Sequence, residues 1–186
     1  MDGYPYEVIR SRRKSISLEI SRQGRILVRA PFSMRDAEIA RFVSGKEEWI
    51  RTHLEKVRRI REQAAGQRLT GDEIRALADR AGREIPPRVE IFARLAGVSY
   101  GRITIRNQKS RWGSCSSRGN LNFNCLLMLA PPGVTDYVIV HELCHRIEMN
   151  HSARFWAEVE RVMPDYREAR KWLRDHGSEI MARMTG

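Results

Sequence analysis

The sequence predicts an α+β fold, because regions of strand-like alternation stand beside long regions of helical spacing. Between residues 6 and 30, apolar and polar residues alternate, as they do around Ile16, Leu18 and Ile20. A second region of this kind runs from residue 98 to residue 123. The other long stretches carry apolar residues three or four positions apart, which is typical of amphipathic helices. The 186 residues, 41% of them hydrophobic, are sufficient for one packed domain with an extension.

The chain is expected to divide near residue 70, where Gly66 and Gly71 flank a short boundary. We expect residues 1–70 to form an N-terminal extension, in which a β-hairpin or small meander precedes helices. Residues 71–186 are expected to form the core of the protein.

In the N-terminal part, Gln23-Gly24 predicts a turn between two strands. Ser33 is a suitable N-cap for the helical region that follows. Helical spacing continues from residue 34 to about residue 65 and predicts one or two amphipathic helices. If there are two, the break is expected near Gly45.

In the second part, a helix is expected over residues 72–84, and Ile85-Pro86-Pro87 is expected to end it, because proline disrupts a helix interior. Helical spacing resumes over residues 89–96. Ser152 is a suitable N-cap for a later helix. A final helix is expected from Tyr166 to about residue 176, after which the chain should fray.

The most informative stretch is His141-Glu142-Leu143-Cys144-His145, with His151 after five further residues. Pro131-Pro132 and an apolar run over residues 134–140 favour a helix that leads into it. Residues four apart lie on one face of a helix, so both imidazoles can reach one ion. Glu142 lies about 100° around the helix and can reach a water on that ion without ligating it. The pattern is typical of zinc metalloproteases, whose sites use three protein ligands and one water.

Other reactive side chains have simpler interpretations. Cys144 is expected to be a small core residue. Ser114 and Cys115 have no recognisable base arrangement, so nucleophilic catalysis is not expected. We assign His53 to a helix surface, because no second ligand stands at helical spacing from it. His176 is expected at a helix end, where a charged imidazole suits the helix dipole.

The chain is strongly basic, with a net charge of +11. The balance is +7 over residues 1–70, +5 over residues 71–130 and −1 over residues 131–186. A basic surface favours acidic partners, nucleic acid included. The alternative is a solvated surface that keeps the protein soluble.

Several features of the sequence favour a cytoplasmic protein that has no membrane span. No apolar run approaches 18 residues, so no transmembrane helix is expected. The N-terminus lacks the apolar region of a secretory signal. The three cysteines form no C-x-x-C pair and no even-numbered framework, which is consistent with a reducing compartment.

A dense set of short motifs lies between residues 100 and 176. They are Arg111-Trp112-Gly113-Ser114-Cys115, Pro131-Pro132, Asp136-Tyr137-Val138, the five-residue histidine motif, Asn150-His151-Ser152, Phe155-Trp156 and Pro164-Asp165-Tyr166. Together they resemble the YgjP-like metallopeptidase family, whose strand-rich start the N-terminal half resembles more weakly. That family is gluzincin-like and zinc-dependent, and it is distantly similar to the SprT-like and WLM proteases.

The resemblance implies a zincin-like metalloprotease core, in which a small antiparallel sheet packs on helices and H-E-x-x-H lies on the active-site helix. It implies one zinc ion per chain, held by His141, His145 and His151, with Glu142 as the general base. The implied reaction is hydrolysis of a peptide bond in a peptide or protein by a zinc-activated water.

Further residues are candidates for contacts to the substrate or the oxyanion. They are Tyr137, Tyr166 and Trp112. Each of them could instead pack in the core. An extended substrate could pair with a strand edge, for which residues 121–124 are the expected strand.

The ligands also need supporting groups. Glu148 or Asp136 could accept a hydrogen bond from a ligating imidazole. Glu158 is the next candidate for the third ligand if His151 is not a ligand.

Two other functions are compatible with the sequence. The basic N-terminal half could make this a nucleic-acid-associated protein, including a protease that acts on DNA-bound proteins. The chain could instead be an inactive scaffold stabilised by zinc. Glu142 argues against the scaffold, because a structural site needs no base and usually closes its fourth position.

Overall fold

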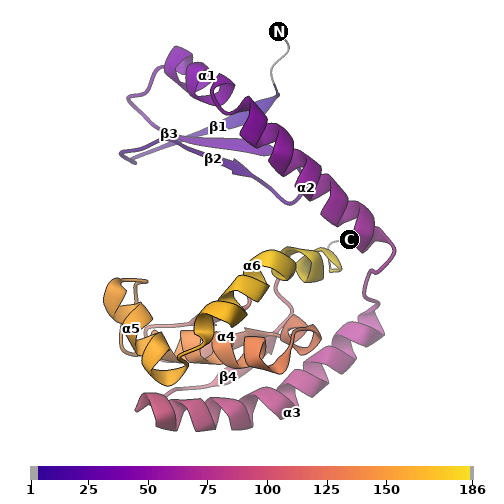
Figure 1. Ribbon diagram of the computed structural model, residues 1–186, viewed down its shortest axis with the longest axis vertical. Helices are drawn as coiled ribbons and strands as arrows, with labels where there is room; N and C mark the ends of the chain where they lie inside the picture. The colour runs from indigo at the N-terminus through magenta and orange to yellow at the C-terminus, as the bar shows by residue number, and fades with distance from the viewer. Residues whose placement is uncertain (1–3, 185–186) are drawn as a thin grey trace. The chain divides into compact units, whose positions relative to one another are not determined.

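The computed structural model describes residues 4–184 and divides the chain into two compact units (Figure 1). The first unit extends to Gly66 and the second begins at Gln67. Each unit has a hydrophobic core of its own. Within residues 4–184, no helix is both long and apolar enough to cross a bilayer.

The first unit begins with a three-stranded mixed sheet of β1 (Tyr6–Ser11), β2 (Ser17–Ile20) and β3 (Ile26–Pro31). The strand order is β1-β3-β2. β2 and β3 form an antiparallel hairpin, and Gly24 in its turn adopts a left-handed φ of 83°. β1 pairs with β3 in parallel, so the three strands do not form a meander.

Two helices, α1 (Asp36–Ser44) and α2 (Glu47–Ala65), supply the rest of this core. Alternate residues of β3 pack with apolar residues of both helices; the core consists of Ile26, Val28, Ala30, Ile39, Val43 and Ile50. The expected N-cap at Ser33 is wrong, because α1 is capped at Arg35. The Arg35 N–H donates to Glu38 Oε2 at 2.9 Å, which satisfies a donor that the helix itself leaves free.

The second unit opens with a single long helix, α3 (Gly71–Ala96). The expected break at Pro86-Pro87 is wrong, since both prolines lie inside this helix. An interior proline costs about 3 kcal/mol. Burial of one helix face offsets this cost, because Ala81, Ile85, Val89, Ala93 and Ala96 are all buried.

A second three-stranded sheet consists of β4 (Ile103–Arg106), β5 (Gly113–Cys115) and β6 (Leu121–Asn124), in the order β4-β6-β5. β5 and β6 are antiparallel, but β4 and β6 are parallel. The sheet is therefore mixed, and the expectation of an antiparallel sheet is wrong in this detail. β6 is also the central strand, so residues 121–124 are not an edge. Strand patterning shows which segments are extended, but partner choice depends on how distant segments pack.

Three helices and a short 3-10 helix complete the second unit. They are η1 (Cys125–Leu129), α4 (Pro132–Cys144), α5 (Ala153–Val162) and α6 (Tyr166–Ala182). α4 is the central element, and it packs against α3, α5, α6 and β5. Its side chains are buried on almost every side, which explains why its sequence is apolar without a polar face.

The last helix is longer than expected. α6 continues past His176 to Ala182, so the expected end near residue 176 is wrong. Gly177 lies against Trp112, and a Cβ at this position would be 3.3 Å from the indole. The absence of a side chain at Gly177 lets the helix pass close to that ring, and Met181 and Ala182 are buried beyond it.

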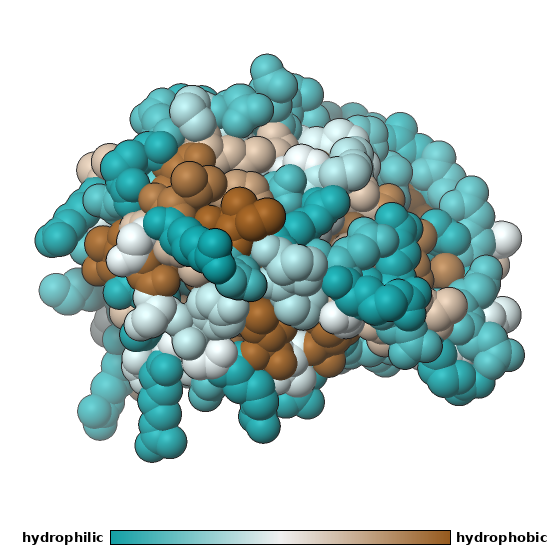
Figure 2. Space-filling model, turned by 90° about the horizontal axis from the view of Figure 1, so that it is seen from below, coloured by the Kyte–Doolittle hydropathy of each residue, from teal (hydrophilic) through white to brown (hydrophobic). Residues whose placement is uncertain are grey.

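Figure 2 shows hydrophobic residues in several patches among hydrophilic ones on the face seen from below. The most exposed large apolar side chains of the second unit are Ile91, Leu95 and Met149.

Candidate metal centre

The C-terminal end of α4 places the first two histidines together. α4 ends at Cys144, and His145 is its C-cap with helical angles of φ −65° and ψ −11°. The four-residue spacing therefore still brings both imidazoles to one side, with ring centroids 5.0 Å apart.

His151 completes a cluster of three imidazoles. The chain turns after His145, and Ser152 then starts α5 by accepting from the Phe155 N–H at 3.3 Å. This turn brings His151 Nε2 to 3.0 Å from His141 Nε2. One nitrogen from each of His141, His145 and His151 lies within 4.8 Å of the other two, so the three could hold one metal ion.

The tautomer of His145 is set by a backbone acceptor. Its Nδ1 lies 3.1 Å from the carbonyl oxygen of Glu148, which can only accept, so Nδ1 carries the proton. Nε2 then keeps its lone pair for a metal ion. The main chain of Glu148 thus supplies the supporting acceptor, whereas Asp136 pairs with Arg88 at 3.0 Å.

The environment of His141 favours the neutral imidazole. Burial, together with the smaller effects of the charges of His145, His151 and Arg170, lowers the pKa of His141 to about 3. Its Nδ1 is buried and has no hydrogen-bond partner among the described residues. Burial also lowers the pKa of His145. Neutral imidazoles that converge in this way suit zinc and similar transition metals, so the residues present fit such an ion.

Glu142 lies beside the cluster and is almost completely buried, with 6% of its surface exposed. Its carboxyl group packs directly on β5, since a Cβ at Gly113 would be 2.7 Å from Glu142 Oε1. Burial raises the pKa of Glu142 to about 8, against the smaller opposing effects of the Arg111 charge and a hydrogen bond from the Cys115 backbone. A carboxyl group with this pKa can take up and release a proton near neutral pH.

An aromatic wall lines the cluster. The Phe155 ring lies 4.9, 4.6 and 4.8 Å from the rings of His141, His145 and His151, respectively. The Trp156 ring stacks on His151 at 5.8 Å. Reasoning from single residues did not assign these two a role, although they immediately follow the capped start of α5.

The sequence matches the YgjP-like metallopeptidase domain over residues 14–80 and 74–176, which include all three histidines and Glu142. The chain belongs to the YgjP-like family. The predicted family and the α+β metallopeptidase fold are thereby confirmed.

Two solved structures resemble part of this YgjP-like protein. The metallopeptidase zymogen abylysin of Pyrococcus abyssi is 22% identical with a TM-score of 0.45, over 49% of this chain and 93% of that one. The metallopeptidase zymogen jannalysin of Methanocaldococcus jannaschii is 21% identical with a TM-score of 0.45, over 50% of this chain and 96% of that one. A search of curated protein sequences found no match.

The other candidate residues of the YgjP-like domain lie at different places. Tyr137 is buried, and its ring contacts His141 at 5.9 Å and Tyr166 at 6.3 Å. Burial raises the pKa of Tyr137 to about 12. Tyr166 is also buried and stacks on Trp156 at 5.6 Å. Trp112 instead packs on Gly177 of α6, and it has no ring contact with a histidine among the described residues.

Glu158, Cys144 and His53 lie outside the histidine cluster. Glu158 forms an ion pair with Arg161 at 2.9 Å and is not part of the metal-binding group found among residues 4–184. Cys144 is fully buried, as expected for a small core residue. Trp49 stacks on His53 at 3.8 Å in the first unit.

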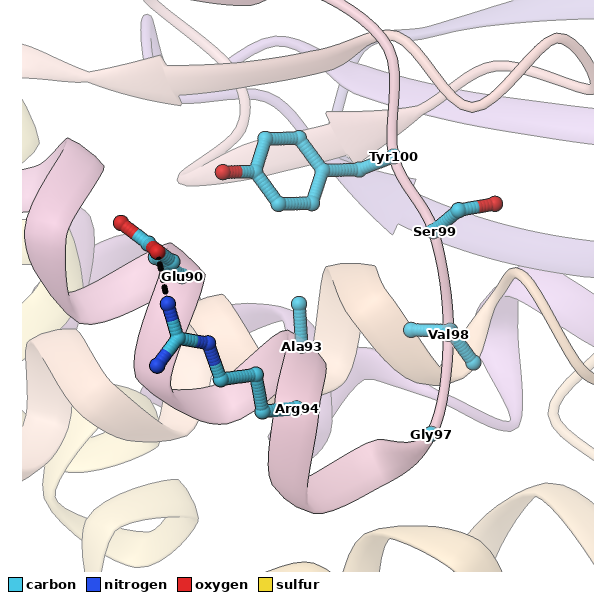
Figure 3. Close-up of a pocket in the computed structure, with 7 residues that line it drawn as sticks. All are labelled: Glu90, Ala93, Arg94, Gly97, Val98, Ser99 and Tyr100. Carbon is cyan, nitrogen blue, oxygen red and sulfur yellow. Dashed lines mark hydrogen bonds and ion pairs between the residues drawn. The ribbon is translucent and has the colours of Figure 1, made fainter.

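A shallow groove of the YgjP-like domain lies between the end of α3 and residues 97–100 (Figure 3). Tyr100 faces the helix across it, and Glu90 and Arg94 form an ion pair at its side. The groove contains none of the candidate metal ligands, so it is not part of the metal centre.

Proposed function

We propose that this protein is a zinc-dependent peptidase in which His141, His145 and His151 hold one zinc ion and Glu142 is the general base. The observation that carries the proposal is the convergence of three imidazole nitrogens within 4.8 Å beside a buried carboxyl group. Membership of a metallopeptidase family supports the reaction class.

The roles of the residues follow from their chemistry. Zinc at such a site supplies Lewis acidity, which acidifies water and polarises a carbonyl group. The negative form of Glu142 is favoured by Arg111 and by any cation held by the histidines. Glu142 takes a proton from the attacking water and gives it to the leaving amine, so that one water and one peptide bond yield an acid and an amine. Tyr137, beside His141, and Tyr166, beside Trp156, are proposed to contribute to substrate or oxyanion contacts.

The substrate is proposed to be an extended peptide or protein segment. β5 pairs with β6 on one side, and its other side is an edge of the sheet. β5 also carries Gly113, which packs on Glu142. A peptide that adds to this edge through main-chain hydrogen bonds would lie beside the general base. β5 thus replaces residues 121–124 as the proposed binding strand, with Trp112 immediately before it.

Metal content and hydrolysis test this proposal together. We expect elemental mass spectrometry of the purified protein to find about one zinc per chain, and none in a His141→Ala/His145→Ala variant. Glu142→Gln should keep the zinc and lose hydrolysis of a peptide library. Hydrolysis at the parent rate by zinc-loaded Glu142→Gln would exclude the assigned base, and a protein that binds no zinc would exclude the peptidase. An inactive scaffold would bind zinc without hydrolysing any peptide.

Nucleic-acid binding by the first unit is the second candidate function. Arg12, Arg13 and Lys14 follow β1 and form no ion pair among the described residues. Consecutive unpaired cations favour phosphate contacts, which weaken steeply as salt rises. We expect Arg12→Ala/Lys14→Ala to reduce both the affinity for a DNA duplex and its salt dependence. Affinity unchanged by salt would exclude this function.

The cysteines bear on the cellular location of the protein. Cys115, Cys125 and Cys144 are all free thiols. Free thiols are consistent with a reducing compartment, so we propose a cytoplasmic location.

A further inference from the structure

One arginine of α6 has no acidic partner among the described residues. Arg170 is exposed, and it forms no ion pair among residues 4–184. Its neighbours on the same helix are neutralised, because Arg167 pairs with Glu160 at 2.5 Å and Lys171 pairs with Asp175 at 2.7 Å. Within the described part of the chain, the charge of Arg170 therefore has no acidic partner, unlike those of Arg167 and Lys171.

The position of Arg170 is fixed by an aromatic ring. Its guanidinium carbon lies 4.2 Å above the ring of Trp156. A guanidinium stacked in this way loses little freedom when it binds an anion, and its N–H groups at the edge stay available as a bidentate donor.

Trp156 connects this cation to the candidate metal centre. Its ring lies 5.8 Å from the ring of His151 and 5.9 Å from that of His141. The indole of Trp156 thus contacts both the guanidinium and the rings of two candidate ligands. A positive charge here opposes a bound cation, so it does not help to hold the metal ion.

A second cation lies on the side of the general base. Arg111 is exposed, and its charge acts on the carboxyl group of Glu142. Two exposed arginines, Arg111 and Arg170, therefore act on groups of the site from different parts of the chain. Positive charge that no acidic side chain pairs with at the edge of a site favours an anionic ligand.

We infer that Arg170, held on Trp156, is a specificity-determining residue that binds a carboxylate of the substrate near the scissile bond. The inference rests on the proposed peptidase function and names its substrate class as acidic peptides. The carboxylate belongs either to an Asp or Glu side chain or to the C-terminus of the peptide, and both present the same two oxygens to the guanidinium.

Equilibrium binding to zinc-loaded Glu142→Gln tests the inference without turnover. Four fluorescent peptides of one length are compared, with Glu or Gln next to the central bond and with a free or amidated C-terminus. One charge-assisted contact predicts about tenfold tighter binding of the peptide that carries the recognised carboxylate. A preference for Glu over Gln identifies a side chain, and a preference for the free terminus identifies the terminal carboxylate.

Variants of Arg170 attribute the preference to this residue. In the Glu142→Gln background, a second substitution Arg170→Gln should remove the preference for the peptide that carries the recognised carboxylate. Arg170→Glu in the same background should reverse the preference in favour of a matched Lys peptide. The control is Arg174→Gln, because Arg174 lies one turn further along α6 and pairs with Asp175 at 3.3 Å. This control should keep the preference.

Two results would overturn the inference: equal affinities for all four peptides, or a preference that persists in Arg170→Gln. Either result is distinct from failure of the proposed function. Hydrolysis of a neutral peptide by the parent, absent in Glu142→Gln, reports on the peptidase function alone.

Discussion

The contact between Gly113 and Glu142 shows how one missing side chain shapes the candidate site. A Cβ at Gly113 would lie 2.7 Å from both Cγ and Oε1 of Glu142. Real Cβ atoms do not approach other atoms so closely, so any larger residue must displace the carboxyl group. The position of the proposed base therefore depends on a residue 29 positions earlier in the sequence.

We predict that Gly113→Ala lowers kcat for peptide hydrolysis by at least about tenfold, because displacement of a general base costs that much or more. Zinc content should be unchanged, since the histidines are not displaced. The matched control is Gly133→Ala in α4, where a Cβ meets nothing within 4 Å. Steady-state kinetics and metal analysis of both variants measure these effects. Full activity in Gly113→Ala would contradict the role given to this contact.

The raised pKa of Glu142 predicts a specific pH dependence of stability in the metal-free protein. The pKa rises from 4.5 in the unfolded chain to about 8 in the folded state, so the folded state retains the proton longer. The resulting stabilisation is complete below pH 4.5 and is lost as the pH rises towards 8. We therefore expect Glu142→Gln to be more stable than the parent at pH 9 by at least about 1 kcal/mol, and the difference to shrink at pH 5.

Urea unfolding in the presence of a chelator at both pH values measures this difference. Glu168→Gln changes an exposed side chain of α6 and serves as the control. A difference between Glu142→Gln and the parent that does not vary with pH would show that Glu142 is not held protonated by burial.

At the scale of elements, α3 and α6 show that packing overrides local signals. Pro86 and Pro87 are helix breakers by local chemistry, and Gly177 resembles a helix end, yet both helices continue. In each case the continuation buries apolar residues against the rest of the unit. The short sheet shows the same effect, since the parallel pairing of β4 with β6 depends on contacts that no single segment specifies.

We predict that Gly177→Val destabilises the second unit by about 1–3 kcal/mol, because the new side chain meets the ring of Trp112. Gly82→Val is the matched control, since Gly82 is an exposed residue inside α3 with nothing within 4 Å of an added Cβ. Both variants change helix propensity equally, so their difference in urea unfolding isolates the contact with Trp112. Equal stability of the two variants would contradict this packing.

At the scale of the whole molecule, the proposed zinc ion joins α4 to the turn before α5. A ligand that binds only the folded state stabilises it, by about 2.7 kcal/mol at a hundredfold excess over its dissociation constant. Burial of the His141 and His145 imidazoles is otherwise a cost of folding, because it lowers their pKa values and the unfolded chain can protonate them freely.

We predict that zinc raises the thermal unfolding midpoint and that a chelator reverses the change. His151→Ala should lose most of this response, because it removes one of three ligands. His53→Ala should retain it, because His53 belongs to the first unit and stacks on Trp49. Differential scanning fluorimetry over a zinc titration measures both, and an undiminished response in His151→Ala would place the third ligand elsewhere.

Much of the candidate site could be predicted from the sequence because its spacing is local. The four-residue interval between His141 and His145 specifies one helix face through helix geometry alone, and the N-cap at Ser152 is likewise a local signal. Whether Glu148 or Asp136 supports a ligand could not be predicted. The decision depends on the backbone carbonyl of Glu148 and on the pairing of Asp136 with distant Arg88.

The sequence by itself determined the α+β class, the family and the histidine cluster, since these follow from periodicity and from residues close together in the chain. Only the tertiary structure decided the strand order β4-β6-β5, the passage of α3 through two prolines and the contact of Gly113 with Glu142. It also placed Arg170 over Trp156. These features join residues far apart in the chain, and their energies come from burial and close packing rather than from local backbone preference.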